Sequence, residues 1–186
     1  MFDKQKKDCL GKVDKSIKQS IDKDIRPLVD LINSTPDYYT TSSCSGRVLL
    51  VEKNSDCKKD CRFVVAEHKK AKFRAIKKSL SKLPKGDVGF KQESVIIHVC
   101  CRDLEKAKTL LKIVRDLGIK RAGIINIGKR IIIEIIGTEA METIIARDGK
   151  ILVEDSYLRV LIKDANKRLE RNKKKIKELQ KKLLFL

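Results

Sequence analysis

Residues 94–101 read SVIIHVCC, an almost unbroken apolar run of the length of a β-strand. A strand with one face in water alternates apolar and polar residues, so this run predicts an internal strand with both faces covered. Asp103 follows and can cap a helix that ends at Gly118. The segment AGIINIGKRIIIEII, residues 122–136, predicts two further strands joined by a glycine-containing turn. An internal strand needs a partner on each edge, so the chain must build a sheet of several strands.

The other periodic segments predict helices and a hairpin around that sheet. They are helices over residues 10–21, 25–32 and 69–83, and a hairpin with strands over 48–51 and 62–68. The acidic residues 22–24 are placed to cap the second helix. The expected fold class is α/β (α+β), a mixed β-sheet with flanking helices. The similar stretches SGRVLLVE (45–52) and GKRIIIEI (128–135) indicate either an internal duplication or convergent strand chemistry.

A long basic helix is predicted at the C-terminal end. Apolar residues recur at alternating steps of four and three from Leu158 to Leu183, with Asn172 as the polar member of the series. This spacing is the seam of a heptad helix. Residues 163–186 carry ten Lys or Arg and three Asp or Glu, so the helix is a basic amphipath. We expect a single α/β catalytic domain over residues 1–162 and a helix over 163–186 that packs on it, in preference to a dedicated RNA-binding arm.

The charge and composition of the chain indicate which binding partners it can attract. The chain has 44 Lys and Arg against 25 Asp and Glu, a net charge of +19, and only 4% aromatic residues. Such an excess attracts phosphate backbones, although a lysine-rich genome can produce basic surfaces without a function. No apolar run approaches the roughly 18 residues of a membrane span, and the first residues lack the apolar core of a signal peptide, so we expect a cytoplasmic protein.

The six cysteines are spaced too irregularly for a secreted disulfide framework. Mostly free thiols are expected, with Cys57 and Cys61 as the pair that could bridge. Combinations of these cysteines with His68, or of Cys100 and Cys101 with a histidine, lack the two compact ligand pairs of structural zinc sites. No metal site is therefore predicted.

Two histidines offer acid–base chemistry. His98 lies on the predicted internal strand, where alternation places it on the same face as Cys100 and Arg102. Imidazole transfers protons near neutral pH, and guanidinium binds carboxylate or phosphate through two hydrogen bonds. His68 lies at the end of another predicted strand. The alternative is a core histidine that bonds a backbone carbonyl beside a surface arginine.

Residues 40–47, TTSSCSGR, are the best candidate for a cofactor-binding segment. The chain contains neither G-x-G-x-x-G nor G-x-x-x-x-G-K-[ST], so no Rossmann or Walker-type phosphate loop is indicated. This segment combines short hydroxyl side chains, a glycine and an arginine. If extended, it would place Thr41, Ser43, Ser45 and Arg47 on one side and Thr40, Ser42, Cys44 and Gly46 on the other. The alternative is an ordinary polar loop that satisfies its own backbone.

Several motifs together resemble one family, the tRNA wybutosine-synthesising protein 3 methyltransferases. The matching stretches, in chain order, are DKSIKQSID, YYTTSSCSGRVLL, AEHK, IIHVCCRDLEKA, AGIINIGKR, GTEAME and YLRVLIKDANKRLERNKKKI. The resemblance implies S-adenosylmethionine-dependent methylation of N4 in a 4-demethylwyosine derivative at position 37 of tRNA(Phe). It also implies binding to the anticodon loop and a fold unlike the Rossmann methyltransferases. Two rivals are a non-catalytic basic RNA-binding module and an assembly protein that uses the heptad helix.

The resemblance also implies site residues. Our own hypothesis for the mechanism makes Asp14 or His98 the catalytic base and assigns tRNA phosphates to lysines of the 69–85 segment and of the C-terminal helix. Cofactor- or substrate-binding roles fall on Ser16, Asp22, Thr41, Ser42, Ser43, Ser45, Arg47, His68, Arg102 and Lys129. The chain departs from the family pattern at Gln19, Ala122, Ile136 and Ile144, where Gly, Ser, Arg and Pro are usual.

Overall fold

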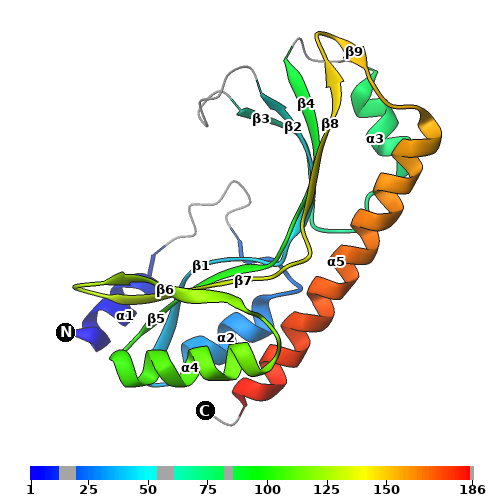
Figure 1. Cartoon of the computed structure of the whole chain (residues 1–186). Helices are drawn as coiled ribbons and strands as arrows, with labels where there is room; N and C mark the ends of the chain where they lie inside the picture. Colours follow the sequence, from blue (N-terminus) through cyan, green and yellow to red (C-terminus); the bar gives the residue numbers. More distant parts are fainter. Residues whose placement is uncertain (13–19, 54–60, 82–85, 185–186) are drawn as a thin grey trace. The chain divides into compact units, whose positions relative to one another are not determined.

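The computed structural model describes residues 1–12, 20–53, 61–81 and 86–184, which form two compact units (Figure 1). Unit 1 contains Met1–Ser45, Val95–Thr138 and Asn172–Leu186, and unit 2 contains Gly46–Ser94 and Glu139–Arg171. Each unit has its own sheet and its own apolar core. The expected catalytic domain over residues 1–162 stays a prediction, since compactness does not show which parts fold or act alone.

Unit 1 is built on a four-stranded sheet in the order β1-β5-β7-β6. Its strands are β1 (Tyr38–Cys44), β5 (Ile96–Cys101), β7 (Ile131–Ile136) and β6 (Arg121–Ile127), and all its pairs are antiparallel. β5 has a partner on each edge, which confirms the internal strand predicted from SVIIHVCC. The predicted strand pair over residues 122–136 is confirmed as β6 and β7. Residues 38–44 form an edge strand rather than a loop, because their backbone pairs with β5.

Three helices complete the described part of unit 1 outside the C-terminal helix: α1 (Phe2–Leu10), α2 (Arg26–Ser34) and α4 (Leu104–Asp116). α2 and α4 lie on the same side of the sheet (Figure 1). Their apolar side chains join Ile97, Val99 and Ile133 in one buried cluster. This burial supplies the main favourable free energy of the unit, because apolar area removed from water contributes about 25 cal/mol per Å².

The ends of α4 confirm the predicted caps, whereas the first helices differ from prediction. Asp103 Oδ1 accepts a hydrogen bond from the Lys106 backbone N–H at 2.8 Å, and Gly118 follows the helix with φ +76°. The acidic cap predicted for α2 is wrong, because no side chain caps that helix. The helix predicted over residues 10–21 is wrong at its described ends: α1 ends at Leu10, and residues 20–22 are not helical.

Unit 2 contains a five-stranded sheet in the order β3-β2-β4-β8-β9, again with antiparallel pairs. Its strands are β2 (Arg47–Lys53), β3 (Cys61–Glu67), β4 (Asp87–Glu93), β8 (Met141–Arg147) and β9 (Lys150–Ile151), and its short helix is α3 (Phe73–Leu80). The predicted β2–β3 hairpin is confirmed. The helix predicted over residues 69–83 is shorter than expected. β4, β8 and β9 lack a clear apolar alternation, and they form strands through their pairing partners.

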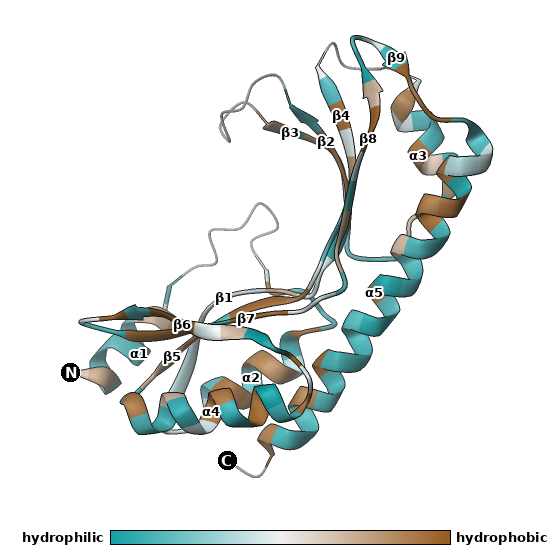
Figure 2. Cartoon of the chain, in the orientation of Figure 1, coloured by the Kyte–Doolittle hydropathy of each residue, from teal (hydrophilic) through white to brown (hydrophobic). Residues whose placement is uncertain are grey.

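The last helix, α5 (Asp155–Leu183), confirms the heptad seam. Every seam position is buried: Leu158, Ile162 and Ala165 join the core of unit 2, and Ile176, Leu179 and Leu183 join the core of unit 1. Hydrophobic and hydrophilic patches alternate along α5 in Figure 2. Among the helices of the described ranges, none has the length and apolarity needed to cross a membrane. The antiparallel sheets confirm that this is not a Rossmann fold, which requires parallel strands.

Replacement Asp103→Ala is expected to lower the free energy of unfolding by about 1 kcal/mol, because it leaves the Lys106 N–H without its helix cap. Urea denaturation followed by circular dichroism measures the change. Asp103→Asn, which can still accept the bond, should retain most of the stability. Equal stability of the Asp103→Ala variant and the unmodified protein would contradict the capping role.

Candidate functional site

The candidate site lies on the face of the unit 1 sheet opposite α2 and α4. The backbone register aligns Ser42, His98, Glu134 and Gly123 as successive Cα partners on β1, β5, β7 and β6. Residues directly opposite each other in antiparallel strands have side chains on the same face. The neighbouring row that contains Ile97 is buried against the helices. These four residues, the polar row, therefore point away from the core.

His98 and Glu134 form a close pair within the polar row. His98 Nε2 lies 2.9 Å from Glu134 Oε1, and the two side chains are 28% and 29% exposed. Both groups thus remain accessible to a ligand while they contact each other. Glu134 is absent from the residues predicted from sequence. The sequence does contain a sign of it, because Glu134 is the one charged residue of the strand IIIEII.

Gly123 ends the polar row in open space. A Cβ built on this glycine would meet no described heavy atom within 4 Å. Gly123 does not have a positive φ, so its backbone does not require glycine. The missing side chain therefore leaves room beside Glu134 rather than permitting a turn.

A β-bulge decides which hydroxyl groups reach this face. Thr40 is the partner of Val99 and Ser42 is the partner of His98, so Thr41 is an extra residue in β1. Thr40 lies on the helix side, where Oγ1 is 3.2 Å from Asn33 Oδ1. The predicted strict alternation, with Thr40 and Ser42 on the same side, is therefore wrong.

After the bulge, Ser43 is opposite the buried Ile97 and shares the helix side. Ser42 is exposed, and Thr41 is half-buried. Of the three predicted hydroxyl ligands within β1, Ser42 is thus the member of the polar row. The ligand contacts of Thr41, Ser42 and Ser43 stay predictions.

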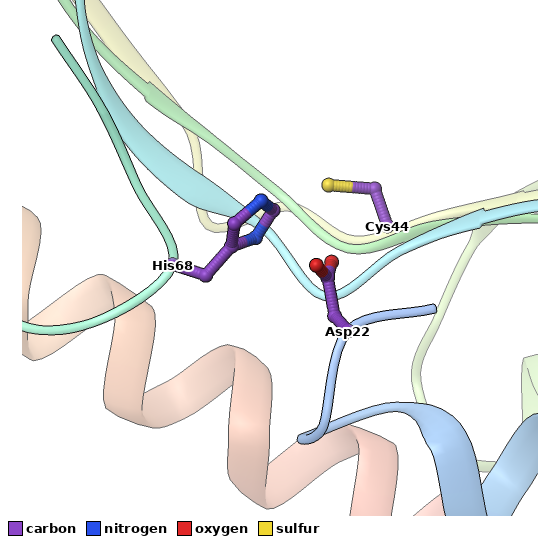
Figure 3. A group of neighbouring side chains, drawn as sticks. All are labelled: Asp22, Cys44 and His68. Carbon is purple, nitrogen blue, oxygen red and sulfur yellow. The ribbon is translucent and has the colours of Figure 1, made fainter. Parts of the chain in front are cut away.

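Asp22 and Ser45 are joined at the end of β1. The buried Asp22 carboxylate accepts hydrogen bonds at Oδ2 from the Ser45 backbone N–H at 3.1 Å and from its hydroxyl at 3.2 Å. Figure 3 shows Asp22 beside Cys44, and a carboxylate oxygen lies within 4.8 Å of the Cys44 Sγ. These bonds anchor the strand to the segment before α2. The ligand-binding roles of Asp22 and Ser45 stay predictions.

Arg47 and His68 belong to unit 2. Arg47 Nε donates to Glu93 Oε2 at 2.7 Å, and its guanidinium lies 5.0 Å from the centre of the Phe63 ring. His68, labelled in Figure 3, has Nδ1 3.2 Å from the Gly46 carbonyl oxygen. The backbone carbonyl therefore selects the tautomer with a proton on Nδ1. The ligand-binding roles of Arg47 and His68 stay predictions.

Arg102 ties α1 to the rest of unit 1. Its Nη2 donates to Asp3 Oδ1 at 2.6 Å, its Nε donates to Asp37 Oδ1 at 2.8 Å, and its guanidinium lies 4.6 Å from the centre of the Phe2 ring. Hydrogen bonding from Arg102 holds the pKa of Asp3 below its ordinary value. The arginine predicted to bind a ligand carboxylate thus already binds two protein carboxylates, and its ligand role stays a prediction.

A second contact of α1 involves the turn between β6 and β7. Gln5 Nε2 donates to the Lys129 carbonyl oxygen at 3.2 Å, while the Lys129 residue is exposed. The role predicted for the Lys129 side chain stays a prediction. Asp14 and Ser16 lie outside the described residues, as does Cys57, so their predicted roles are not tested.

The comparisons with known proteins define the class of the chain as a methyltransferase. The family model described as Methyltransferase TYW3 matches residues 4–184. The chain belongs to the Methyltransferase TYW3 family, which confirms the resemblance seen in its motifs. The prediction of an enzyme is also confirmed, and the two non-catalytic alternatives lose their support.

Relatives and solved structures cover most of the chain. The tRNA wybutosine-synthesizing protein 3 homolog of Danio rerio is 37% identical over 181 residues, 94% of this chain and 71% of that protein. The tRNA(Phe) 7-((3-amino-3-carboxypropyl)-4-demethylwyosine(37)-N(4))-methyltransferase of Methanocaldococcus jannaschii is 34% identical over 174 residues, 91% of this chain and 90% of that protein. The structure of the PH1069 protein from Pyrococcus horikoshii has a TM-score of 0.91 at 32% identity, covering 99% and 94% of the two chains.

We expect the packing of α1 against the rest of unit 1 to weaken at low pH. Because the folded-state pKa of Asp3 is lowered from 3.8, its pair with Arg102 stabilises the docked helix above about pH 4 and loses this effect as pH falls through the lowered value. Hydrogen-exchange protection factors of the α1 amides, measured by NMR, should therefore fall in that range. Arg102→Ala should abolish this protection at neutral pH.

The matched control is Arg147→Ala in unit 2, because Arg147 also donates two hydrogen bonds to one carboxylate, that of Asp87. This control should leave the protection factors of α1 unchanged. Undiminished protection of α1 in the Arg102→Ala variant would show that other contacts hold the helix.

Proposed function

We propose that this protein transfers the methyl group of S-adenosylmethionine to N4 of a 4-demethylwyosine derivative at position 37 of tRNA(Phe). The observation that carries the proposal is the accessible His98–Glu134 pair in the polar row of a chain that belongs to a methyltransferase family. The names of relatives that are 34% and 36% identical over most of the chain give the substrate and the nitrogen. We place the reaction in the cytoplasm and at the anticodon loop, which contains position 37.

His98 is the proposed base. A ring nitrogen that attacks a methyl group needs a free lone pair, so any proton on it must leave as the bond to carbon forms. Imidazole is suited to accept that proton near neutral pH. Asp14, the other residue predicted for this role, lies outside the described residues. The half-exposed position of His98 allows contact with a bound base.

The polar row fits a cofactor and a planar substrate ring. S-adenosylmethionine supplies the methyl group on a positively charged sulfur, and its amino acid and ribose parts form hydrogen bonds. Ser42 and Thr41 offer hydroxyl groups for such bonds, and the space over Gly123 can receive a flat ring. The other proposed ligand contacts are the remaining residues predicted from the sequence: Ser16, Asp22, Ser43, Ser45, Arg47, His68, Arg102 and Lys129.

Positive charge supports the tRNA part of the proposal. The chain has a net charge of +19 with its acidic residues included, and a protein surface with such an excess of positive charge attracts phosphates. We assign phosphate binding to lysines of α3 and α5. Some basic side chains of α5 already pair within the chain, as Arg171 does with Glu139 at 2.8 Å, so the contribution of individual residues differs.

The direct test is incubation with tRNA(Phe) that carries the unmethylated precursor and labelled S-adenosylmethionine, followed by nucleoside mass analysis. We expect label at N4 of the modified base. Replacement His98→Ala should lower kcat roughly 100- to 10,000-fold, the usual contribution of a general base, with an unchanged circular dichroism spectrum. Full turnover by this variant would exclude His98 as the base, and a protein that labels no precursor tRNA would refute the reaction.

Replacement Gly123→Ala tests the space in the polar row. The added methyl group should raise KM for the tRNA, because it occupies the room beside Glu134, while stability remains equal or rises slightly. Gly89→Ala in β4 is the matched control, since its Cβ would make ordinary contacts at 3.8 and 3.9 Å in unit 2. Equal KM values for the two variants would argue against a ring over Gly123.

A further inference from the structure

We propose that Glu134 is a positioning residue that holds the His98 imidazole with its proton on Nε2, so that Nδ1 is the nitrogen that accepts a proton from the substrate. This inference rests on the proposed function and deepens it. It adds a residue that the sequence motifs do not single out. It also assigns different roles to the two nitrogens of His98.

The geometry of the pair fixes the direction of the hydrogen bond. An ionised carboxylate has no proton to donate, so at 2.9 Å Glu134 Oε1 must accept from His98 Nε2. A neutral imidazole carries one proton, and with that proton on Nε2 the lone pair is on Nδ1. When Nδ1 takes a second proton, the adjacent carboxylate stabilises the resulting imidazolium. The same contact thus orients the base and favours its protonated product.

The position of Glu134 in β7 argues against a role limited to the core. Ile133 and Ile135 on either side of it point into the buried cluster, and Ile132 and Ile136 are half-buried on its own face. A carboxylate beside such apolar neighbours loses hydration, which costs free energy unless a partner compensates. The described hydrogen bond of Glu134 goes to His98. An arginine or lysine would provide a stronger structural partner than a histidine.

The remaining ionisable groups of this face lie in neighbouring rows. Tyr39 of β1 and Cys100 of β5 share the row on one side. Cys44 of β1 and Arg121 of β6 share the row of Ile96 on the other side. Glu134 is therefore the carboxylate directly opposite His98 in the register. Its partner on the other edge is Gly123, where space for a substrate ring is open. This arrangement places the orienting group, the base and the open space in one line.

The test is ¹⁵N NMR of the imidazole nitrogens, combined with kinetics. The chain has two histidines, so the spectrum of His98→Ala assigns the signals. In the unmodified protein, neutral His98 should be almost entirely the Nε2–H tautomer, with a proton protected from exchange. Glu134→Gln should give a mixed tautomer population, because an amide can donate as well as accept. Its kcat should fall on the order of 10- to 100-fold with KM changed less than about two-fold.

Two further variants separate positioning from general damage. Glu134→Asp keeps a carboxylate and should recover part of the lost kcat. Glu142→Gln is the matched control, since Glu142 is an exposed strand carboxylate of unit 2 that pairs with Lys53 at 2.9 Å. It should change neither the tautomer nor kcat. The double variant of His98→Ala with Glu134→Gln should be no less active than His98→Ala alone, because Glu134 acts through His98.

The outcomes distinguish this inference from the proposed function. An unchanged His98 tautomer and an unchanged exchange rate in Glu134→Gln would overturn the positioning role, whatever the activity. A tautomer that responds to Glu134→Gln in a protein that methylates no precursor tRNA would overturn the proposed reaction and leave the positioning contact established. A response in both the spectrum and kcat supports both.

Discussion

Burial of one face of β5 against the helices is the interaction on which unit 1 depends. Ile97 and Val99 enter the apolar cluster with α2 and α4 side chains, and alternation then directs His98 to the other face. Antiparallel pairing brings Ser42 and Glu134 beside it. A slip of one residue would turn His98 into the core and expose its apolar neighbours, so core packing protects the register of the polar row.

The elements of unit 1 are held in two different ways. α2 and α4 bury aliphatic side chains, whereas α1 buries none of its residues. α1 instead depends on polar contacts, among them the pair of Arg102 with Asp3 and the bond from Gln5 to the Lys129 carbonyl, and on the ring contact of Phe2 with Tyr39. An element with little apolar burial opens more easily than a core element, and its contacts respond to pH and salt. We therefore expect acidity and ionic strength to affect α1 before they affect the sheet.

α5 contributes both to the stability of the fold and to the positive charge of the chain. Its apolar seam contributes to both cores, while its exposed face carries most of the basic residues of the C-terminal segment. Such a division lets one helix stabilise the fold and attract a polyanion, because the two tasks use opposite faces. Membership of a methyltransferase family adds chemistry to this basic scaffold. We propose that the chemistry takes place on the sheet, in the polar row, where the strands hold side chains in fixed positions.

Much of the fold could be predicted, and less of the site. β5, the β6–β7 pair, α4 with its caps and the seam of α5 all follow from patterns within a few residues. The sequence left open whether residues 40–47 are an extended segment or an ordinary polar loop, because Ser and Thr commonly satisfy their own backbone. Only the pairing with β5 makes residues 38–44 a strand. Asp22 resembles a helix cap in sequence, yet it bonds Ser45, 23 residues away. Such partners cannot be seen in a local pattern.

The sequence by itself therefore determined the internal strand, the capped helices, the heptad seam, the basic charge and the family, because periodicity, caps and motifs are properties of neighbouring residues. Only the tertiary structure decided that Glu134 meets His98, that a bulge turns Thr40 from the polar row, and that Arg102 holds α1. The physical reason is register. Which side chains face each other across a sheet depends on the pairing of strands 36 residues apart, as for His98 and Glu134, and the packed core selects that pairing.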